Sequence, residues 1–143
     1  MSAALIDRID AALSGRRLLE HPFFVALGRG SLPRDSLQAY GAQFCHFELA
    51  YPTILARIHR RYTLQRFRQQ VLDRLWAESR DEVSHVDLWL DLCGALGLAR
   101  EEVRSGGPST ATAGLVDTFR ELSDRESVIG ASALYVYESQ APL

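Results

Sequence analysis

Residues 76–89 read WAESRDEVSHVDLW, a stretch in which apolar residues recur at helical spacing between acidic residues and one histidine. On one continuous helix, at about 100° per residue, Glu82 lies about 40° from Glu78, and His85 lies about 20° from it on the other side. Two carboxylates and an imidazole then point into the same space. Like charges buried together cannot all stay ionised unless a cation lies among them. The stretch therefore makes Glu78, Glu82 and His85 candidate metal ligands.

Two interpretations of this stretch stay open. The segment 82–85 has the Glu-x-x-His spacing with which helical bundles present a carboxylate and an imidazole to a dinuclear metal centre. The same residues also fit a solvated helical face whose acidic side chains pair with arginines such as Arg74 and Arg80. A further ligand elsewhere in the chain would favour the metal centre.

Glu138, in the stretch LYVYESQAP at 134–142, is such a candidate. Its carboxylate stands on an otherwise apolar predicted helix, where a lone charge needs a partner. That partner is either a metal ion or an arginine of a neighbouring helix. Carboxylate and imidazole ligands suit iron or manganese, and the cysteines lack the spacing of a structural zinc site. We therefore expect iron.

The rest of the chain also has helical periodicity, and strand-like alternation is nearly absent. Breaks rich in glycine, proline and serine divide it into helices that we expect at 3–13, 21–28, 34–61, 64–96, 111–122 and 126–143, with a short turn at 99–104. We expect a single all-α domain over residues 1–143. The last apolar helix stops without a glycine cap or a polar tail, so we expect this sequence to be the first part of a longer chain.

Composition limits the classes of function. The 143 residues are 47% hydrophobic and 24% charged with a formal net charge of -2, which indicates a globular core and disfavours nucleic acid as a partner. All 16 basic residues are arginine, so no lysine Schiff base forms within this segment. We expect the two cysteines, Cys45 and Cys93, to be small buried apolar residues. No signal peptide or membrane span is recognisable, so we expect a cytoplasmic protein with no membrane partner.

Four stretches carry a family resemblance: HPFF at 21–24, AYP at 50–52, DEVSHVDLWLDLCGALG at 81–97 and LYVYESQAP at 134–142. In this order they resemble the haem-oxygenase-like superfamily, and within it the CADD-like group of haem-oxygenase-like diiron oxidases. TenA and PqqC proteins are more distant relatives of that group. The resemblance implies an all-α haem-oxygenase-like helical bundle, with residues 1–143 as its N-terminal two-thirds and without its C-terminal helices.

The resemblance also implies a site with two ferrous ions and O2 as co-substrate, with manganese as an alternative at one position. The family's ligand pattern matches Glu78, His85 and Glu138, and further ligands would come from a His-x3-Asp-x2-His helix beyond Leu143. Glu82 stays a second-tier ligand, because the Glu-x-x-His spacing favours it while the family pattern favours Glu78.

The implied function is a non-haem diiron oxidase or oxygenase. It would activate O2 to oxidise or cleave a small amino-acid-like or amine substrate, in p-aminobenzoate and folate or natural-product biosynthesis. In the CADD-like group, p-aminobenzoate synthesis resembles a self-sacrificing use of the enzyme's own tyrosine and lysine. Here Phe24 stands where that tyrosine is expected, and lysine is absent. Tyr40 is therefore the candidate catalytic tyrosine, and a separate small-molecule substrate is an equal alternative.

Two other functions remain open. A metal-independent enzyme similar to TenA or PqqC would keep its chemistry when Glu78 or His85 is replaced. A non-catalytic helical interaction module would bind no metal and would pair Glu138 with an arginine. A homodimer is common for this fold and would help to cover exposed helix faces, so we expect one.

Overall fold

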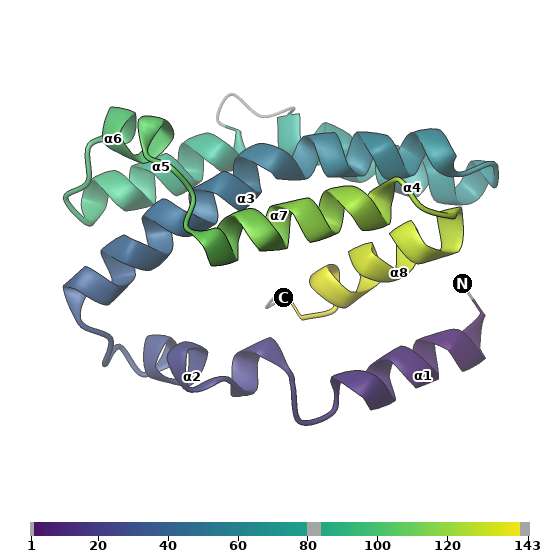
Figure 1. The fold of residues 1–143 in the computed structure, drawn as a ribbon, viewed down its shortest axis with the longest axis horizontal. Helices are drawn as coiled ribbons and strands as arrows, with labels where there is room; N and C mark the ends of the chain where they lie inside the picture. The colour runs from purple at the N-terminus through teal and green to yellow at the C-terminus, as the bar shows by residue number, and fades with distance from the viewer. Residues whose placement is uncertain (1, 80–83, 141–143) are drawn as a thin grey trace.

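The computed structural model describes residues 2–79 and 84–140, and every regular element in these ranges is a helix (Figure 1). The all-α expectation is therefore confirmed. None of the helices in the described ranges is long and apolar enough to span a bilayer. The helices are α1 (Ala3–Leu13), η1 (Leu18–Glu20), α2 (Pro22–Gly28), α3 (Arg34–Arg61), α4 (Gln65–Ser79), α5 (His85–Ala95), α6 (Arg100–Ser105), α7 (Thr110–Ser123) and α8 (Ser127–Glu138).

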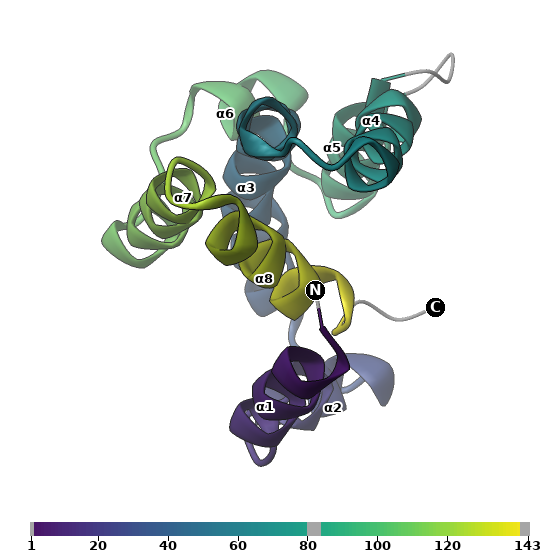
Figure 2. The same cartoon turned by 90° about the vertical axis from the view of Figure 1, so that its right-hand side faces the viewer.

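The long helix α3 lies at the centre of the molecule. It runs between α4 and α5 on one side and α7 on the other, and α8 and α1 lie below it (Figures 1 and 2). Its buried side chains recur every three or four residues, so one helix supplies an apolar stripe to several neighbours. Each of the most buried is no more than 2% exposed: Phe47, Tyr51, Ile54, Leu55 and Ile58.

A second buried cluster joins α3 to α5 and α6. Cys45 of α3 and Leu90 and Cys93 of α5 are fully buried in it. Both cysteines are thus small apolar core residues, as predicted. The indole Nε1 of Trp89 donates a hydrogen bond to Gly41 O at 2.7 Å, which adds a directed contact between α5 and α3.

The predicted single helix over 64–96 is wrong, because the chain forms α4 and α5 there. Ser84 has extended backbone angles (φ -70°, ψ 160°), and its side-chain oxygen accepts a hydrogen bond from Asp87 N at 3.2 Å. A serine cap satisfies one of the free N–H groups at a helix start, and this favours a new helix over continuation of the old one. Both helices pack on α3 and follow each other along one side of it (Figures 1 and 2). The apolar residues of α4 and of α5 therefore recur at helical spacing, as they would on one long helix.

The last helix, α8, ends at Glu138, before the predicted end at 143. The side chain of Gln140 connects this end of α8 to η1. Its Oε1 accepts a hydrogen bond from Leu18 N at 2.8 Å, and its Nε2 donates to Val136 O at 3.0 Å. At Gly130, α8 lies close to α3: a Cβ at this position would lie 3.4 Å from Ile58 Cγ1, in ordinary van der Waals contact. This approach brings the end of α8 to the middle of α3.

We expect Leu90→Ala to lower the free energy of unfolding by about 2–5 kcal/mol, because it leaves a cavity between α5 and α3. Urea unfolding followed by circular dichroism measures this change. Leu88 on the same helix is 56% exposed, so Leu88→Ala is a matched control with an expected change below about 0.5 kcal/mol. Equal losses in the two variants would contradict this packing.

Candidate metal centre

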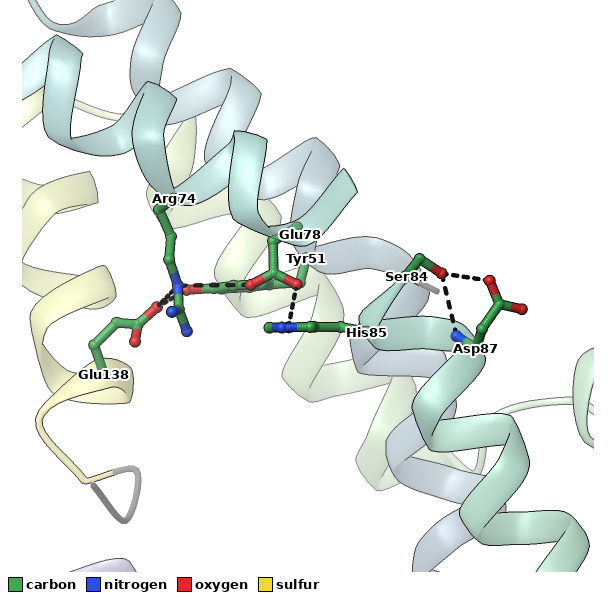
Figure 3. Close-up of polar contacts among 7 residues, drawn as sticks. All are labelled: Tyr51, Arg74, Glu78, Ser84, His85, Asp87 and Glu138. Atoms are coloured by element: carbon green, nitrogen blue, oxygen red, sulfur yellow. Dashed lines mark hydrogen bonds and ion pairs between the residues drawn. The ribbon is translucent and has the colours of Figure 1, made fainter. Parts of the chain in front are cut away.

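Glu78 is a buried carboxylate in the last turn of α4. Its side chain is 3% exposed, and Oε2 lies 2.8 Å from Nδ1 of His85, the first residue of α5 (Figure 3). Oε1 makes no hydrogen bond with any described residue and lies 3.5 Å from Arg74 Nε, one turn earlier on α4. A solvated helical face is therefore the wrong interpretation for Glu78. A charge buried this far requires a compensating positive charge.

The break between α4 and α5 places His85 against Glu78. On a continuous helix, residues seven positions apart are separated by about 10 Å along the axis, so the direct contact depends on the break. The predicted shared helical stripe is thus wrong, although the two side chains do meet. Ser84 Oγ donates to Asp87 Oδ2 at 2.8 Å, and Asp87 accepts from Arg100 of α6 at 2.7 Å. These bonds fix the start of α5 and direct His85 towards α4 (Figure 3).

Glu138 reaches the same region from α8. Tyr51 of α3 donates a hydrogen bond to Glu138 Oε1, and Arg74 Nε donates to the same oxygen at 3.0 Å. Burial and the bond to this carboxylate raise the pKa of Tyr51 well above its usual range. Burial by itself lowers the pKa of Arg74, but Glu138, Tyr51 and Glu78 together outweigh burial and raise it. Glu138 therefore has an arginine partner, which was one of the two alternatives for its charge.

Glu48 of α3 is a third carboxylate at this site, and the sequence patterns above did not single it out as a ligand. One ligand atom each of Glu48, Glu78 and His85 lies within 4.8 Å of the other two. Burial raises the pKa of Glu48, and the negative charge of Glu78 raises it further, against the lowering effects of His85 and Arg74. The available signal was the one used for Glu138, a single carboxylate among aromatic and apolar residues of a helix.

These side chains fit a divalent metal ion. Two carboxylates and an imidazole from α3, α4 and α5 offer oxygen and nitrogen donors of the kind that iron and manganese bind. The buried Oε1 of Glu78 is an acceptor without a hydrogen bond, and a cation would satisfy it. Glu48, Glu78 and His85, with the neighbouring Glu138, form a carboxylate–histidine site.

Tyr40 lies in a cluster of aromatic rings. Burial raises the pKa of Tyr40, and the charge of Glu48 raises it further. Within the described ranges, no hydrogen bond or ion pair joins its hydroxyl to the carboxylate–histidine site. Glu82 lies outside the described residues. The Tyr40 ring packs at centroid distances between 5.0 and 5.9 Å against Phe23, Phe24, Phe44 and Trp89.

The fold and the site together define an all-helical bundle protein with a candidate metal centre beside its central helix. The chain belongs to the TENA/THI-4/PQQC family, whose family model matches residues 8–142. The haem-oxygenase-like fold and the resemblance to that superfamily are thereby confirmed.

The matches to curated relatives cover nearly all of this chain but only part of the length of each relative. The 4-aminobenzoate synthase of Chlamydia muridarum is 36% identical over 143 residues, which cover 99% of this chain and 61% of the relative. The 4-aminobenzoate synthase of Nitrosomonas europaea is 33% identical, with 95% of this chain and 59% of the relative covered. The pyrroloquinoline-quinone synthase of Xanthomonas campestris is 32% identical, with 95% and 57% covered. The chain thus spans about three-fifths of the length of these relatives.

We expect Tyr51→Phe to lower the free energy of unfolding by about 1.5–3 kcal/mol at pH 7, because it removes a buried hydrogen bond to a carboxylate. The raised pKa of Tyr51 means that this stabilisation is complete below the unfolded pKa of about 10 and is lost as the pH rises further. The difference between wild type and variant should therefore shrink above about pH 10. Urea unfolding at neutral and at alkaline pH measures both effects.

Tyr62→Phe is the matched control. The Tyr62 ring packs on Phe67 with centroids 3.8 Å apart, and no described residue forms a hydrogen bond with its hydroxyl. We expect this control to change stability at pH 7 by less than about 0.5 kcal/mol. A Tyr51→Phe chain as stable as the control at pH 7 would contradict the importance of the bond to Glu138.

Proposed function

We propose that this chain carries the metal centre of a non-haem diiron oxidase or oxygenase that activates O2 to oxidise a small amino-acid-like or amine substrate. We further propose that it acts in 4-aminobenzoate biosynthesis. The observation that carries the proposal is the carboxylate–histidine site, with its buried Glu78 and the acceptor atom that lacks a hydrogen bond. The relatives named 4-aminobenzoate synthase match almost the whole chain, which supports the biosynthetic role.

The three ligands implied by the resemblance lie at one site in this fold. Glu78 and His85 are in contact at 2.8 Å, and Arg74 lies between the carboxylates of Glu78 and Glu138. Ferrous ions bound by these residues would supply the electrons with which O2 is activated. Carboxylate and imidazole donors support iron, with manganese as an alternative at one position.

Arg74 acts as an internal counter-ion in this proposal. Its Nε is within 3.5 Å of one oxygen of each carboxylate, so it balances charges that a metal ion would otherwise balance. The Arg74 side chain is 42% exposed and can swing into solvent while α4 stays folded. When Glu78 and Glu138 bind metal, the metal ion would then replace the Arg74 guanidinium as their positive partner.

Two tyrosines, the buried Tyr51 and the half-buried Tyr137, cover the site on the α8 side. Burial raises the pKa of Tyr137, and the charges of Glu48, Glu138 and Glu78 raise it further, so this hydroxyl stays protonated at neutral pH. Its ring packs on Phe47 and Tyr51 with centroid distances of 4.9 and 5.2 Å. In the proposed enzyme these rings exclude water, while the Tyr51 hydroxyl orients Glu138.

We propose Tyr40 as the catalytic tyrosine. Its ring lies 5.9 Å from the ring of Phe24, the position at which the resemblance expects a tyrosine. It also stands two helical turns before Glu48 on α3, so both residues belong to the same central helix. The contact between Phe24 of α2 and Tyr40 of α3 supports the proposal that Tyr40 takes the role of the tyrosine expected at position 24.

A metal-independent enzyme is the second candidate. The ion pairs of Arg74 with Glu78 and Glu138 favour it, because one guanidinium contacts both carboxylates and offsets part of their negative charge without a metal. The relative named pyrroloquinoline-quinone synthase adds support. The Arg74–Glu138 pair also agrees with a non-catalytic interaction module, and metal binding separates both alternatives from the diiron enzyme.

We expect the full natural chain that contains residues 1–143 to bind two ferrous ions when loaded anaerobically, as counted by native mass spectrometry. Glu78→Gln should remove at least one ion, because the buried carboxylate donor becomes a neutral amide. His59→Ala is the control, since His59 lies in the last turn of α3, three turns beyond Glu48. A wild-type chain that binds no iron would contradict the diiron proposal and favour the metal-independent alternatives.

We expect Tyr40→Phe in the iron-loaded full chain to lower the yield of 4-aminobenzoate under oxygen about 100-fold or more, a loss typical of a missing catalytic group. Liquid chromatography with mass spectrometry quantifies the product, and the iron count should stay unchanged. Tyr135→Phe is the matched control, because the Tyr135 hydroxyl bonds to Asp10 of α1 instead. Unaltered product from Tyr40→Phe would exclude the proposed role of Tyr40.

A further inference from the structure

The carboxylate of Glu48 lacks a partner of its own at the carboxylate–histidine site. Glu78 contacts His85 and Arg74, and Glu138 is held by Tyr51 and Arg74. Glu48 forms no hydrogen bond or ion pair with any residue in the described ranges, although its ligand atom lies within 4.8 Å of those of Glu78 and His85. A half-buried acid beside a second acid is unfavourable unless a cation joins the group.

The spacing of these three side chains suits a single ion. Oxygen and nitrogen donors bound to one divalent ion at about 2.1 Å lie no more than about 4.2 Å apart, so small side-chain rotations close the remaining gap. The three residues come from three helices, because Glu48 lies on α3, Glu78 on α4 and His85 on α5. Each helix thus offers one donor.

We infer that Glu48 is a direct ligand of the metal ion that Glu78 and His85 hold, a role that adds α3 to the ligand-bearing helices and rests on the proposed function. Two carboxylates then balance the charge of a divalent ion without Glu138. The same helix carries Tyr51, one turn further on, which bonds to Glu138. α3 therefore connects the Glu78–His85 part of the site to the α8 part.

The test is Mn2+ binding to the metal-free full natural chain, measured by titration calorimetry and by the shift in melting temperature that Mn2+ causes. Glu48→Gln is expected to weaken Mn2+ binding at least about tenfold and to reduce the Mn2+-induced shift in melting temperature, which follows the logarithm of the affinity. Without metal, Glu48→Gln should melt at or above the wild-type temperature, because it removes a negative charge beside Glu78. Glu121→Gln, on the exposed surface of α7, is the control and should change neither measurement.

Glu48→Asp separates a ligand from a mere charge. It keeps the negative charge but withdraws the carboxylate by one methylene. Direct ligation by Glu48 therefore predicts weaker Mn2+ binding, whereas a purely electrostatic role predicts unchanged Mn2+ binding. It also serves as the second variant if Glu48→Gln does not fold. Binding by Glu48→Asp equal to that of wild type would overturn the ligand role.

The outcomes distinguish this inference from the proposed function. If Glu78→Gln loses Mn2+ while both Glu48 variants bind it as wild type does, Glu48 is not a ligand and the metal centre stands. If the wild-type chain binds no Mn2+, or Glu78→Gln binds it unchanged, the metal centre fails and the ligand role of Glu48 fails with it. Weaker Mn2+ binding by the Glu48 variants and by Glu78→Gln supports both the ligand role of Glu48 and the metal centre.

Discussion

Glu78 brings a negative charge into the contact between α4 and α3, and its neighbours are arranged around that charge. His85 reaches it because the chain breaks before α5, and Arg74 reaches it from one turn back on α4. Arg74 in turn holds Glu138, which is near because α8 approaches α3. Apolar residues in place of a buried ionic group are often neutral or stabilising, so stability alone does not explain this arrangement. The proposed metal centre would give this buried charge a function.

The central helix serves both the core and the site. Phe47 and Tyr51 belong to the buried stripe of α3, and the same turns carry Glu48 and the hydroxyl that bonds to Glu138. Loss of packing along α3 would therefore move the donors as well as the core. This coupling places the site on rigid, well-packed elements, which is what a metal centre with fixed ligand positions needs.

The all-helical fold and most helix bounds could be predicted because apolar periodicity and glycine or proline breaks are local signals. The break before His85 was missed, since both halves pack on α3 and keep one period, although Ser84 followed by Asp87 is a helix-start signal. Glu138 was found as a lone carboxylate on an apolar helix, whereas Glu78 and His85 were found from their spacing on one expected helix and from the family resemblance. Glu48 was missed although it is also a single carboxylate among apolar residues, and the packing of α3 against two other helices is what shows that it faces the same space.

Arg74 bears on whether the chain needs metal in order to fold. Small zinc-binding domains unfold without their metal, because metal binding supplies much of their folding free energy. Here a guanidinium already lies between the carboxylates of Glu78 and Glu138, and the surrounding helices bury a core of their own. In the proposed metalloenzyme, the chain would therefore fold first and bind metal afterwards, with Arg74 holding the carboxylates of Glu78 and Glu138 in place until then.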